Sequence, residues 1–212
     1  MSTDDIYDAV LDYDEELVPE LIKAELEKGT DVRVLLDEGL IDALDEVGRR
    51  FSEGTLFIPE MLLAAEAVQA GLEVLRPLLV DTGAKPIGTV VIGTVKGDLH
   101  DIGKNLVVMM LEGAGFRVVD LGTDVDPEDF ITAVQAHEAE VVALSGLLTT
   151  SMPEMQAAVE ALTQARRTRN INARVIVGGP PINQEFADMI GADGYGIDAP
   201  TAVARARELV GA

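Results

Sequence analysis

The sequence predicts an all-α domain over residues 1–84, built as a small antiparallel four-helix bundle, followed by a doubly wound parallel α/β domain over residues 85–212. Two observations predict this division. Apolar residues recur with helical spacing as far as residue 84, and beyond it short β-branched apolar runs alternate with helical stretches. Because strands of a parallel sheet are buried on both faces, such runs are typical of a sheet covered by helices on each side.

The helical half contains about four predicted helices joined by short links. One of them, LVPELIKAELEKG (17–29), ends at Gly29, and Thr30 is a candidate N-cap for the next helix. That next helix has three-to-four spacing among Val34, Leu35, Leu40, Ile41, Leu44 and Val47. The last helix begins near Pro59, a residue that suits the first turn.

The α/β half contains four predicted strands and a weaker fifth. The four are IGTVVIG (87–93), FRVVDLG (116–122), VVALSG (141–146) and ARVIVGG (173–179). The fifth lies near DGYGI (193–197), and a last helix follows from Asp198. The segment VDTGAKP (80–86) is the predicted linker between the two domains.

Composition excludes several classes of function. The formal net charge is −22, and residues 1–84 hold 21 of the 38 acidic residues but only 6 of the 16 basic ones. Nucleic acids and anionic membranes need clustered lysine and arginine, so we expect neither as a partner. The absence of cysteine excludes disulfides, thiolate nucleophiles and cysteine-ligated metals within the chain. The sequence shows no signal peptide and no apolar run of spanning length, and a cytoplasmic protein is expected.

The first strand of the α/β half runs into an unusual loop, VKGDLHDIGKN (95–105). Ligands of open parallel sheets bind at the carboxyl ends of the strands. The loop matches neither the G-x-G-x-x-G fingerprint nor a P-loop, but it places Asp98 two residues before His100. An imidazole bonded to a carboxylate is usual for a metal ligand or a general base. Spacing alone leaves a structural histidine and a ligand or catalytic histidine equally open.

The rest of the chain does not supply a conventional metal site. The only other histidine, His137, lies near Glu138 and Glu140 at the exposed end of a predicted helix, so zinc or iron held by several histidines is not indicated. A single histidine is a more plausible ligand when a macrocycle supplies the others. The loop after the second strand, DLGTDVDPEDF (120–130), reads as an ordinary strand–turn–helix link with Asp126 as its N-cap.

Three segments resemble cobalamin-binding domains. GDLHDIGKN contains their D-x-H-x-x-G motif as Asp98, His100 and Gly103, and SGLLTTS (145–151) and VGGPP (177–181) are similar to their second and third binding segments. Residues 47–77 resemble the helical cap that precedes the cobalamin domain of methionine synthase. Two-domain chains of this size are similar to the corrinoid proteins of methanol, methylamine and aryl-ether methyltransferase systems. The resemblance implies a Rossmann-like cobalamin-binding domain preceded by a cap.

The resemblance also implies roles for individual residues. His100 would be the lower axial ligand of the cobalt in base-off, histidine-on cobalamin, with Asp98 and Ser151 as its proton relay. The remaining implied cofactor contacts are Gly97, Leu99, Asp101, Ile102, Gly103, Ser145, Leu147, Thr149, Gly178, Gly179, Tyr195 and Ala199, with Phe51, Ile58 and Met61 in the cap. Helix N-capping is the alternative role for Ser151, and ordinary bundle packing is the alternative for the neighbouring Leu62.

The function implied by the resemblance is that of a methyl carrier cycling between Co(I) and methyl-Co(III). Its partners would be a substrate-specific corrinoid methyltransferase, an acceptor methyltransferase and a reductive activase. The chain lacks a substrate-methyltransferase barrel, for which about 250 residues are typical, so it would be a carrier subunit rather than a complete enzyme. Residues 81–86 are a candidate hinge for cap movement. The alternatives are the small subunit of an adenosylcobalamin mutase, a cobalamin-dependent sensor, and an α/β binding protein for another ligand.

Overall fold

The computed structural model describes residues 3–81, 86–169 and 171–211. Residues 82–85 of the predicted linker and hinge lie outside this set. The chain divides into two compact units, a helical one within residues 1–85, to which residues 112–115 are also assigned, and an α/β one in the remainder of residues 86–212.

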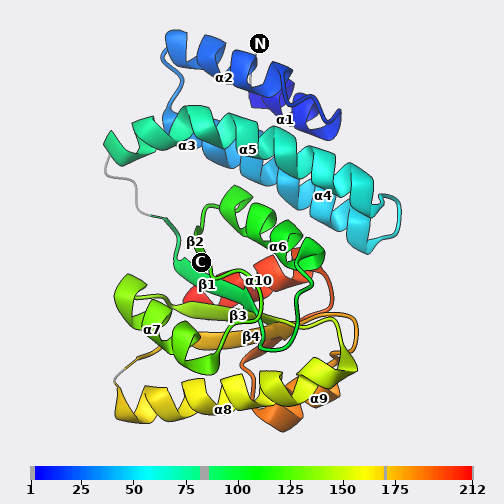
Figure 1. Ribbon diagram of the computed structural model, residues 1–212. Helices are drawn as coiled ribbons and strands as arrows, with labels where there is room; N and C mark the ends of the chain where they lie inside the picture. Colours follow the sequence, from blue (N-terminus) through cyan, green and yellow to red (C-terminus); the bar gives the residue numbers. More distant parts are fainter. Residues whose placement is uncertain (1–2, 82–85, 170, 212) are drawn as a thin grey trace. The chain divides into compact units, whose positions relative to one another are not determined.

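Residues 3–81 are almost entirely helical, which confirms the predicted all-α class (Figure 1). They form α1 (Thr3–Leu11), α2 (Leu17–Glu27), α3 (Val32–Val34), the π-helical segment η1 (Leu35–Ile41), α4 (Asp42–Ser52) and α5 (Ile58–Asp81). Because α3, η1 and α4 follow one another without a break, these residues make up four helical stretches.

The third helical stretch differs in detail from its prediction. Its cap is Asp31, whose Oδ1 accepts a hydrogen bond from the amide of Arg33 at 2.8 Å. The expected role of Thr30 is wrong, because the Thr30 hydroxyl donates instead to Oε2 of Glu25 at 2.9 Å. The π-helical turns were not predicted. Within them, a Cβ on Gly39 would lie 3.1 Å from Cγ2 of Ile6, so the glycine lets α1 pack closely against η1.

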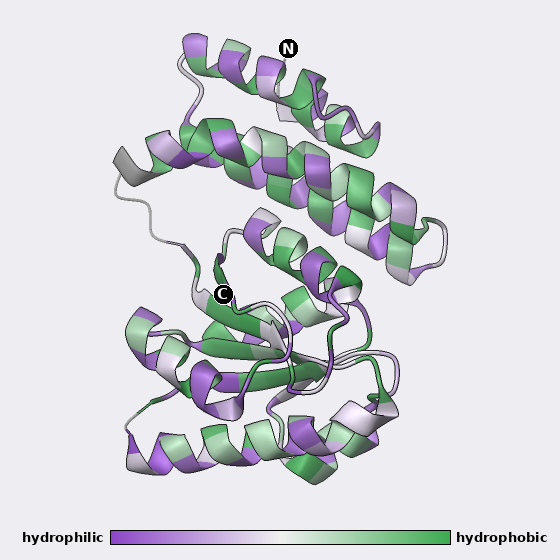
Figure 2. Ribbon diagram, viewed as in Figure 1, coloured by the Kyte–Doolittle hydropathy of each residue, from purple (hydrophilic) through white to green (hydrophobic). Residues whose placement is uncertain are grey.

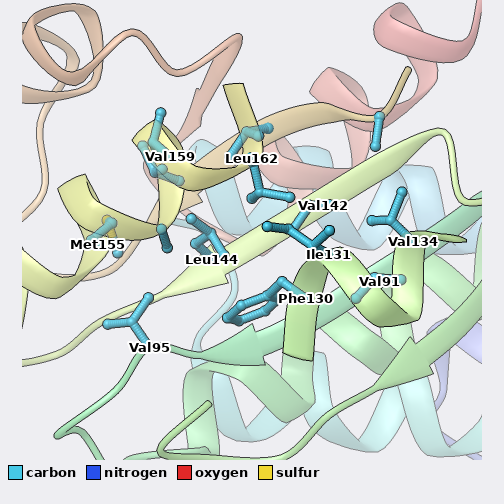
Figure 3. Close-up of a cluster of buried hydrophobic side chains, with 14 of the residues drawn as sticks. Val91, Val95, Phe130, Ile131, Val134, Val142, Leu144, Met155, Val159 and Leu162 are labelled. Carbon is cyan, nitrogen blue, oxygen red and sulfur yellow. The ribbon is translucent and has the colours of Figure 1, made fainter. Parts of the chain in front are cut away.

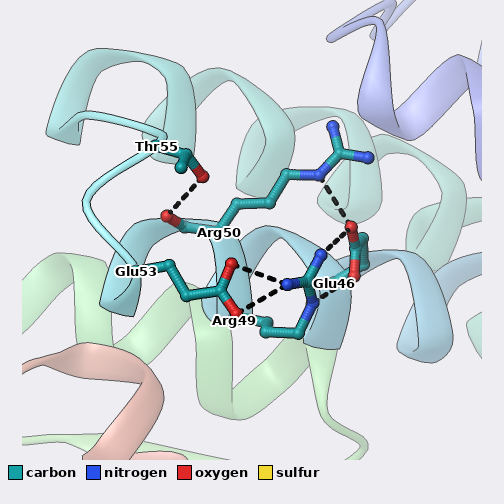
Figure 4. Close-up of polar contacts among 5 residues, drawn as sticks. All are labelled: Glu46, Arg49, Arg50, Glu53 and Thr55. Carbon is teal, nitrogen blue, oxygen red and sulfur yellow. Dashed lines mark hydrogen bonds and ion pairs between the residues drawn. The ribbon is translucent and has the colours of Figure 1, made fainter.

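Charged side chains form ion pairs at the C-terminal end of α4 (Figure 4). Arg49 and Arg50 each donate to Oε1 of Glu46 at 2.7 Å, and Arg49 also pairs with Glu53 at 2.7 Å. These hydrogen bonds lower the pKa of Glu46 to about 2. The Thr55 hydroxyl donates to the carbonyl of Arg50 at 3.0 Å, so the turn after α4 is tied to the helix it leaves.

The α/β unit contains the predicted parallel sheet, including the weak fifth strand. Its strands are β1 (Thr89–Thr94), β2 (Arg117–Asp120), β3 (Val141–Ser145), β4 (Arg174–Gly178) and β5 (Gly194–Gly196), in the order β2-β1-β3-β4-β5. The intervening elements are α6 (Ile102–Gly113), α7 (Pro127–His137), the short 3-10 helix η2 (Thr149–Ser151), α8 (Met152–Thr168), α9 (Gln184–Ile190) and α10 (Ala199–Val210). In this doubly wound order, β2 is added on one side of β1 and β3 to β5 on the other, so the strand order reverses between β1 and β3. Ligands bind at the carboxyl ends of strands at such a point.

One core of this unit lies between the sheet and helices α7, α8 and α9 (Figure 3). Phe130 of α7 is completely buried against Val91 of β1 and Val142 of β3 in this cluster. Gly93 makes room for the Phe130 ring, since a Cβ there would lie 2.9 Å from it. The core fixes the strands whose ends carry the site.

Hydropathy follows the elements (Figure 2). The strands of the sheet are mostly apolar, as expected for strands buried on both faces, whereas the helices alternate between apolar and polar residues. Among the described residues, no helix combines the length and apolar character needed to cross a membrane.

Candidate functional site

The site is centred on Asp98, a carboxylate with no exposed surface in the loop after β1. Its Oδ1 accepts hydrogen bonds from the backbone amide of His100, at 3.1 Å, and from Nδ1 of the His100 ring, at 2.7 Å. The spacing of Asp98 and His100 in the sequence indicated this pairing. These two hydrogen bonds to Asp98 fix both the backbone and the ring of His100.

The other oxygen of Asp98 faces the loop after β3. Oδ2 accepts from the amides of Leu147 and Leu148, at 2.7 and 3.2 Å, and from the hydroxyl of Ser151 at 3.0 Å. The two loops follow β1 and β3, the parallel strands between which the strand order reverses. The parallel pairing of β1 with β3 thus brings Asp98 and His100 next to Ser151, which lies 53 residues after Asp98 in the sequence.

Ser151 occupies the N-cap position of α8 but forms no capping hydrogen bond there. Its Oγ lies 3.0 Å from Oδ2 of Asp98 and 2.8 Å from the carbonyl oxygen of Leu148. A hydroxyl has one proton, so it can donate to only one of these two acceptors at a time. Ser151 therefore contacts the Asp98 carboxylate and does not cap α8.

Burial and hydrogen bonding act on Asp98 in opposite directions. Burial raises its pKa, but the hydrogen bonds from His100, the Leu147 amide and Ser151 together outweigh it and hold the pKa well below its usual range. Asp98 is therefore ionised at neutral pH. An ionised partner at Oδ1 places the imidazole proton on Nδ1 and leaves the lone pair of a neutral ring on Nε2.

The His100 side chain is half exposed, at 52%, and among the described residues Nε2 has no hydrogen-bond partner. The hydroxyl of Thr94, a completely buried residue at the end of β1, donates to the His100 carbonyl oxygen at 2.9 Å. Thr94 was not predicted as a site residue. A fixed imidazole with one free nitrogen is suited to act as a single axial metal ligand.

Exposed apolar side chains lie in the same two loops and at the start of α6. Leu99 and Ile102 are 73% and 76% exposed, and Leu147 and Leu148 are about 40% exposed. A Cβ on Gly103 would meet nothing within 4 Å, so there is open space beside the loop. A free imidazole nitrogen with apolar side chains and open space nearby fits a large planar macrocycle that carries its own metal.

The third predicted segment meets the second through glycines. The amide of Gly146 donates to the Gly178 carbonyl at 3.2 Å, and a Cβ on Gly179 would lie 1.9 Å from the Gly146 carbonyl oxygen. Glycine is therefore required at Gly179. Ser145 is half-buried at the end of β3.

The other predicted contacts occupy varied environments. The Tyr195 hydroxyl donates to the Ile182 carbonyl at 3.0 Å, and Ala199 is buried at the start of α10. Gly97, Asp101 and Thr149 are exposed. Of the predicted cap contacts, Phe51 is partly buried, Ile58 is half exposed and Met61 is completely buried. Ile58 therefore has the accessible surface that a cofactor contact needs.

The loop after β2 is not the ordinary link that its sequence indicates. Asp126 is at the N-cap position of α7 but forms no capping hydrogen bond, and instead pairs with Lys96 at 2.5 Å. Asp124 contacts Gly97 of the loop after β1. His137 lies at the end of α7, with Nδ1 3.4 Å from Arg117. Within the described residues there is no group of three or more His, Cys, Asp or Glu side chains that could hold a metal ion.

The fold and this site are those of a B12-binding protein. A family model described as B12 binding domain matches residues 88–204, and a second model of the same description matches residues 3–76. The chain belongs to this family and, within it, to the corrinoid proteins of methyltransferase systems.

Two curated relatives span nearly the whole chain. Trimethylamine corrinoid protein 1 of Methanosarcina acetivorans is 40% identical over 205 residues, covering 96% of this chain and 94% of the relative. A corrinoid protein of Desulfitobacterium hafniense is 36% identical over 211 residues, covering 98% of this chain and 97% of the relative.

Two solved structures are similar over the same length. A cobalamin-binding protein from Desulfitobacterium hafniense has a TM-score of 0.81 and 33% identity, with 98% of each chain covered. A chain of the methanol:cobalamin methyltransferase complex from Methanosarcina barkeri has a TM-score of 0.81 and 32% identity, covering 97% of this chain and 78% of that one.

Proposed function

We propose that this protein is a corrinoid methyl carrier that receives a methyl group from a substrate-specific methyltransferase and delivers it to an acceptor methyltransferase. The observation that carries the proposal is the half-exposed imidazole of His100, with Nε2 free and Nδ1 held by the buried carboxylate of Asp98. When bound, cobalamin supplies a cobalt centre that can accept and release a methyl group.

The residues of the chain would bind the cofactor and hold the proton on Nδ1 of His100. His100 would hold the cobalt through Nε2, while Asp98 holds the Nδ1 proton. The hydrogen bond from Nδ1 to Asp98 fixes the ring of His100 and leaves Nε2 to bind the metal. Ser151 can turn its single proton between Asp98 Oδ2 and the Leu148 carbonyl, so it adjusts to the charge on Asp98.

The helical half of the chain and its named relatives favour a methyl carrier over a mutase subunit. An adenosylcobalamin mutase subunit would not need the helical region, yet residues 3–76 match a B12 binding domain model of their own. The relatives named for trimethylamine and the solved methanol:cobalamin complex make methylated amines and methanol the first substrates to test. The proposal includes a reductive activase as a further partner, a cytoplasmic location and no complete activity of the chain alone.

Reconstitution of the apoprotein with hydroxocobalamin tests the proposal. We expect stoichiometric binding with the absorption spectrum of histidine-ligated, base-off cobalamin. The reduced holoprotein should then accept a methyl group from trimethylamine, dimethylamine or methanol in the presence of the matching methyltransferase. A wild-type protein that takes up no cobalamin would overturn the proposal.

Replacing His100 tests the ligand assignment. We expect His100→Ala to lose the histidine-ligated spectrum and to bind hydroxocobalamin more weakly, by about tenfold or more, because second-sphere and ligand changes at metal sites have effects of this size. His137→Ala is the matched control, since it removes the other imidazole from a position on α7 outside the site. An unchanged cobalt spectrum in His100→Ala would contradict the assignment.

A further inference from the structure

The loop after β2, here the brace loop (121–126), is hydrogen-bonded to the loop after β1, here the ligand loop (95–101). The amide of Gly97 donates to Oδ1 of Asp124 at 2.7 Å, and the amide of Asp124 donates to the carbonyl of Asp98 at 3.0 Å. These two bonds join the loops at adjacent backbone positions. They hold the main chain of Gly97 and Asp98 to the loop after β2, whereas the Asp98 carboxylate also contacts the loop after β3.

Asp124 combines two properties that this contact requires. Its backbone is left-handed, with a φ of 56°, a conformation in which aspartate and asparagine are tolerated better than most residues. Its side chain is exposed, so the bond to Gly97 is not a product of burial in the core.

The brace loop is itself held to β1 and α6. The amide of Thr94 donates to the Gly122 carbonyl at 2.9 Å, and the amide of Val125 donates to the Thr94 carbonyl at 3.0 Å. Asp120 accepts from the Gly122 amide at 2.9 Å and from the buried amine of Lys104 at 2.5 Å. The brace loop is thus an ordered support for Asp124 rather than a free surface loop.

We propose that Asp124 is a positioning residue for the cobalt ligand, acting through the main chain of Gly97 and Asp98. The inference rests on the proposed function, because the ligand is His100. A shift of the Asp98 backbone would displace both Oδ1, which holds the ring of His100, and the amide of His100 two residues on. Asp124 therefore helps to fix the orientation of the His100 ring, and with it the position of Nε2, before any cofactor binds.

Three variants test this role. Asp124→Gly keeps the left-handed backbone and removes the acceptor, whereas Asp124→Asn keeps an acceptor oxygen and removes the charge. Glu138→Gly is the matched control, because Glu138 is also exposed and left-handed, with a φ of 52°, but belongs to the end of α7. Each is compared with wild type as apoprotein and after loading with hydroxocobalamin.

In the apoprotein we expect the Gly97 amide of Asp124→Gly to exchange its hydrogen about tenfold faster, since it loses its acceptor. In the loaded protein we expect a smaller fraction of histidine-ligated cobalt, read from nitrogen splitting in the electron paramagnetic resonance spectrum of the Co(II) form. Affinity for hydroxocobalamin should fall by about tenfold, within the range of outer-sphere changes at metal sites. Asp124→Asn and Glu138→Gly should stay close to wild type.

The outcomes separate this inference from the proposed function. Failure of wild type to bind hydroxocobalamin would overturn the function. Normal binding by wild type with a wild-type fraction of histidine-ligated cobalt in Asp124→Gly would overturn the positioning role alone. An equal loss in Asp124→Asn would assign the effect to charge, and an equal loss in Glu138→Gly would assign it to a general backbone change; either result also overturns the role.

Discussion

At the scale of single residues, Gly179 leaves no room for a side chain. A Cβ there would lie 1.9 Å from the Gly146 carbonyl oxygen, and the φ of Gly179 is 129°. We expect Gly179→Ala to lower the free energy of unfolding by about 3 kcal/mol or more, because backbone has to move in both strand-end loops. Urea unfolding followed by circular dichroism measures this loss.

Gly191→Ala is the control for that substitution. Gly191 also has a positive φ, of 75°, but a Cβ there meets nothing within 4 Å. Its replacement should cost only about 1 kcal/mol, the strain of the backbone conformation alone. Equal losses in the two variants would mean that crowding against Gly146 is not what requires glycine at Gly179.

The sequence predicts the side chains of the site better than its backbone contacts. Asp98 and His100 are neighbours in the chain, and Ser151 belongs to a motif of its own. The amides of Leu147 and Leu148 and the role of Asp124 depend on how close three strand-end loops come. Amide donors are present at every residue except proline, so no residue type in the sequence distinguishes them.

At the scale of elements, two helices with aspartate at the N-cap position differ in how they start. Asp198 accepts from the Thr201 amide at 2.8 Å and caps α10, whereas Asp126 makes no such bond before α7. We expect Asp198→Ala to destabilise the protein by about 1 kcal/mol and Asp126→Ala by less than about 0.5 kcal/mol, since an exposed ion pair with Lys96 contributes little.

Thermal unfolding of the two variants, compared with wild type, measures that difference. A loss in Asp126→Ala as large as in Asp198→Ala would show that the ion pair to Lys96 stabilises the loop as strongly as a cap stabilises a helix.

Whether a segment forms a helix or a strand was more predictable than the kind of helical turn or the residue that caps a helix. Short β-branched runs predicted four of the five strands, and β5 was predicted only as a weaker strand near DGYGI (193–197). Leu35 and Leu40 are five residues apart, a wider gap than the three-to-four spacing of an α-helix, but this single gap did not suffice to predict the π-helical turns of η1. The cap at Asp31 rather than Thr30 depends on a bond from Thr30 back to Glu25, which spacing does not specify.

At the scale of the whole α/β unit, Asp193 makes stability depend on pH. It pairs with Arg166 of α8 and Arg174 of β4, and accepts from the Val175 amide at 2.8 Å. Burial raises its pKa, but these partners outweigh burial and lower the pKa below its ordinary value. Its stabilisation is therefore complete above the unfolded pKa of about 4 and is lost as the pH falls through the folded pKa.

Replacing the Asp193 carboxylate tests whether it makes the stability of the protein depend on pH. We expect Asp193→Asn to lower the free energy of unfolding by about 2 kcal/mol at pH 7, since hydrogen bonds to charged groups are lost. The difference from wild type should shrink as urea unfolding is repeated at lower pH. A difference that stays constant down to pH values below about 3 would contradict a contribution from the ionised carboxylate.

The position of the site within the unit follows from strand order. Predicted strands and their end loops indicate which loops carry ligand chemistry, but not that β1 lies between β2 and β3. That order brings the loop after β2 beside the ligand loop, and the sequence alone suggested an ordinary link there. Strand order arises from packing of the whole sheet, so local patterns do not determine it.

The edges of the sheet have a consequence for self-association. β5 has only three residues and β2 only four, and β2 begins and ends with the exposed charged residues Arg117 and Asp120. Strand addition between copies needs a longer row of unpaired backbone groups, and charges at an edge oppose it. The sheet should therefore resist polymerisation through its edges at high concentration. A carrier that meets one enzyme after another benefits from diffusing as a discrete particle.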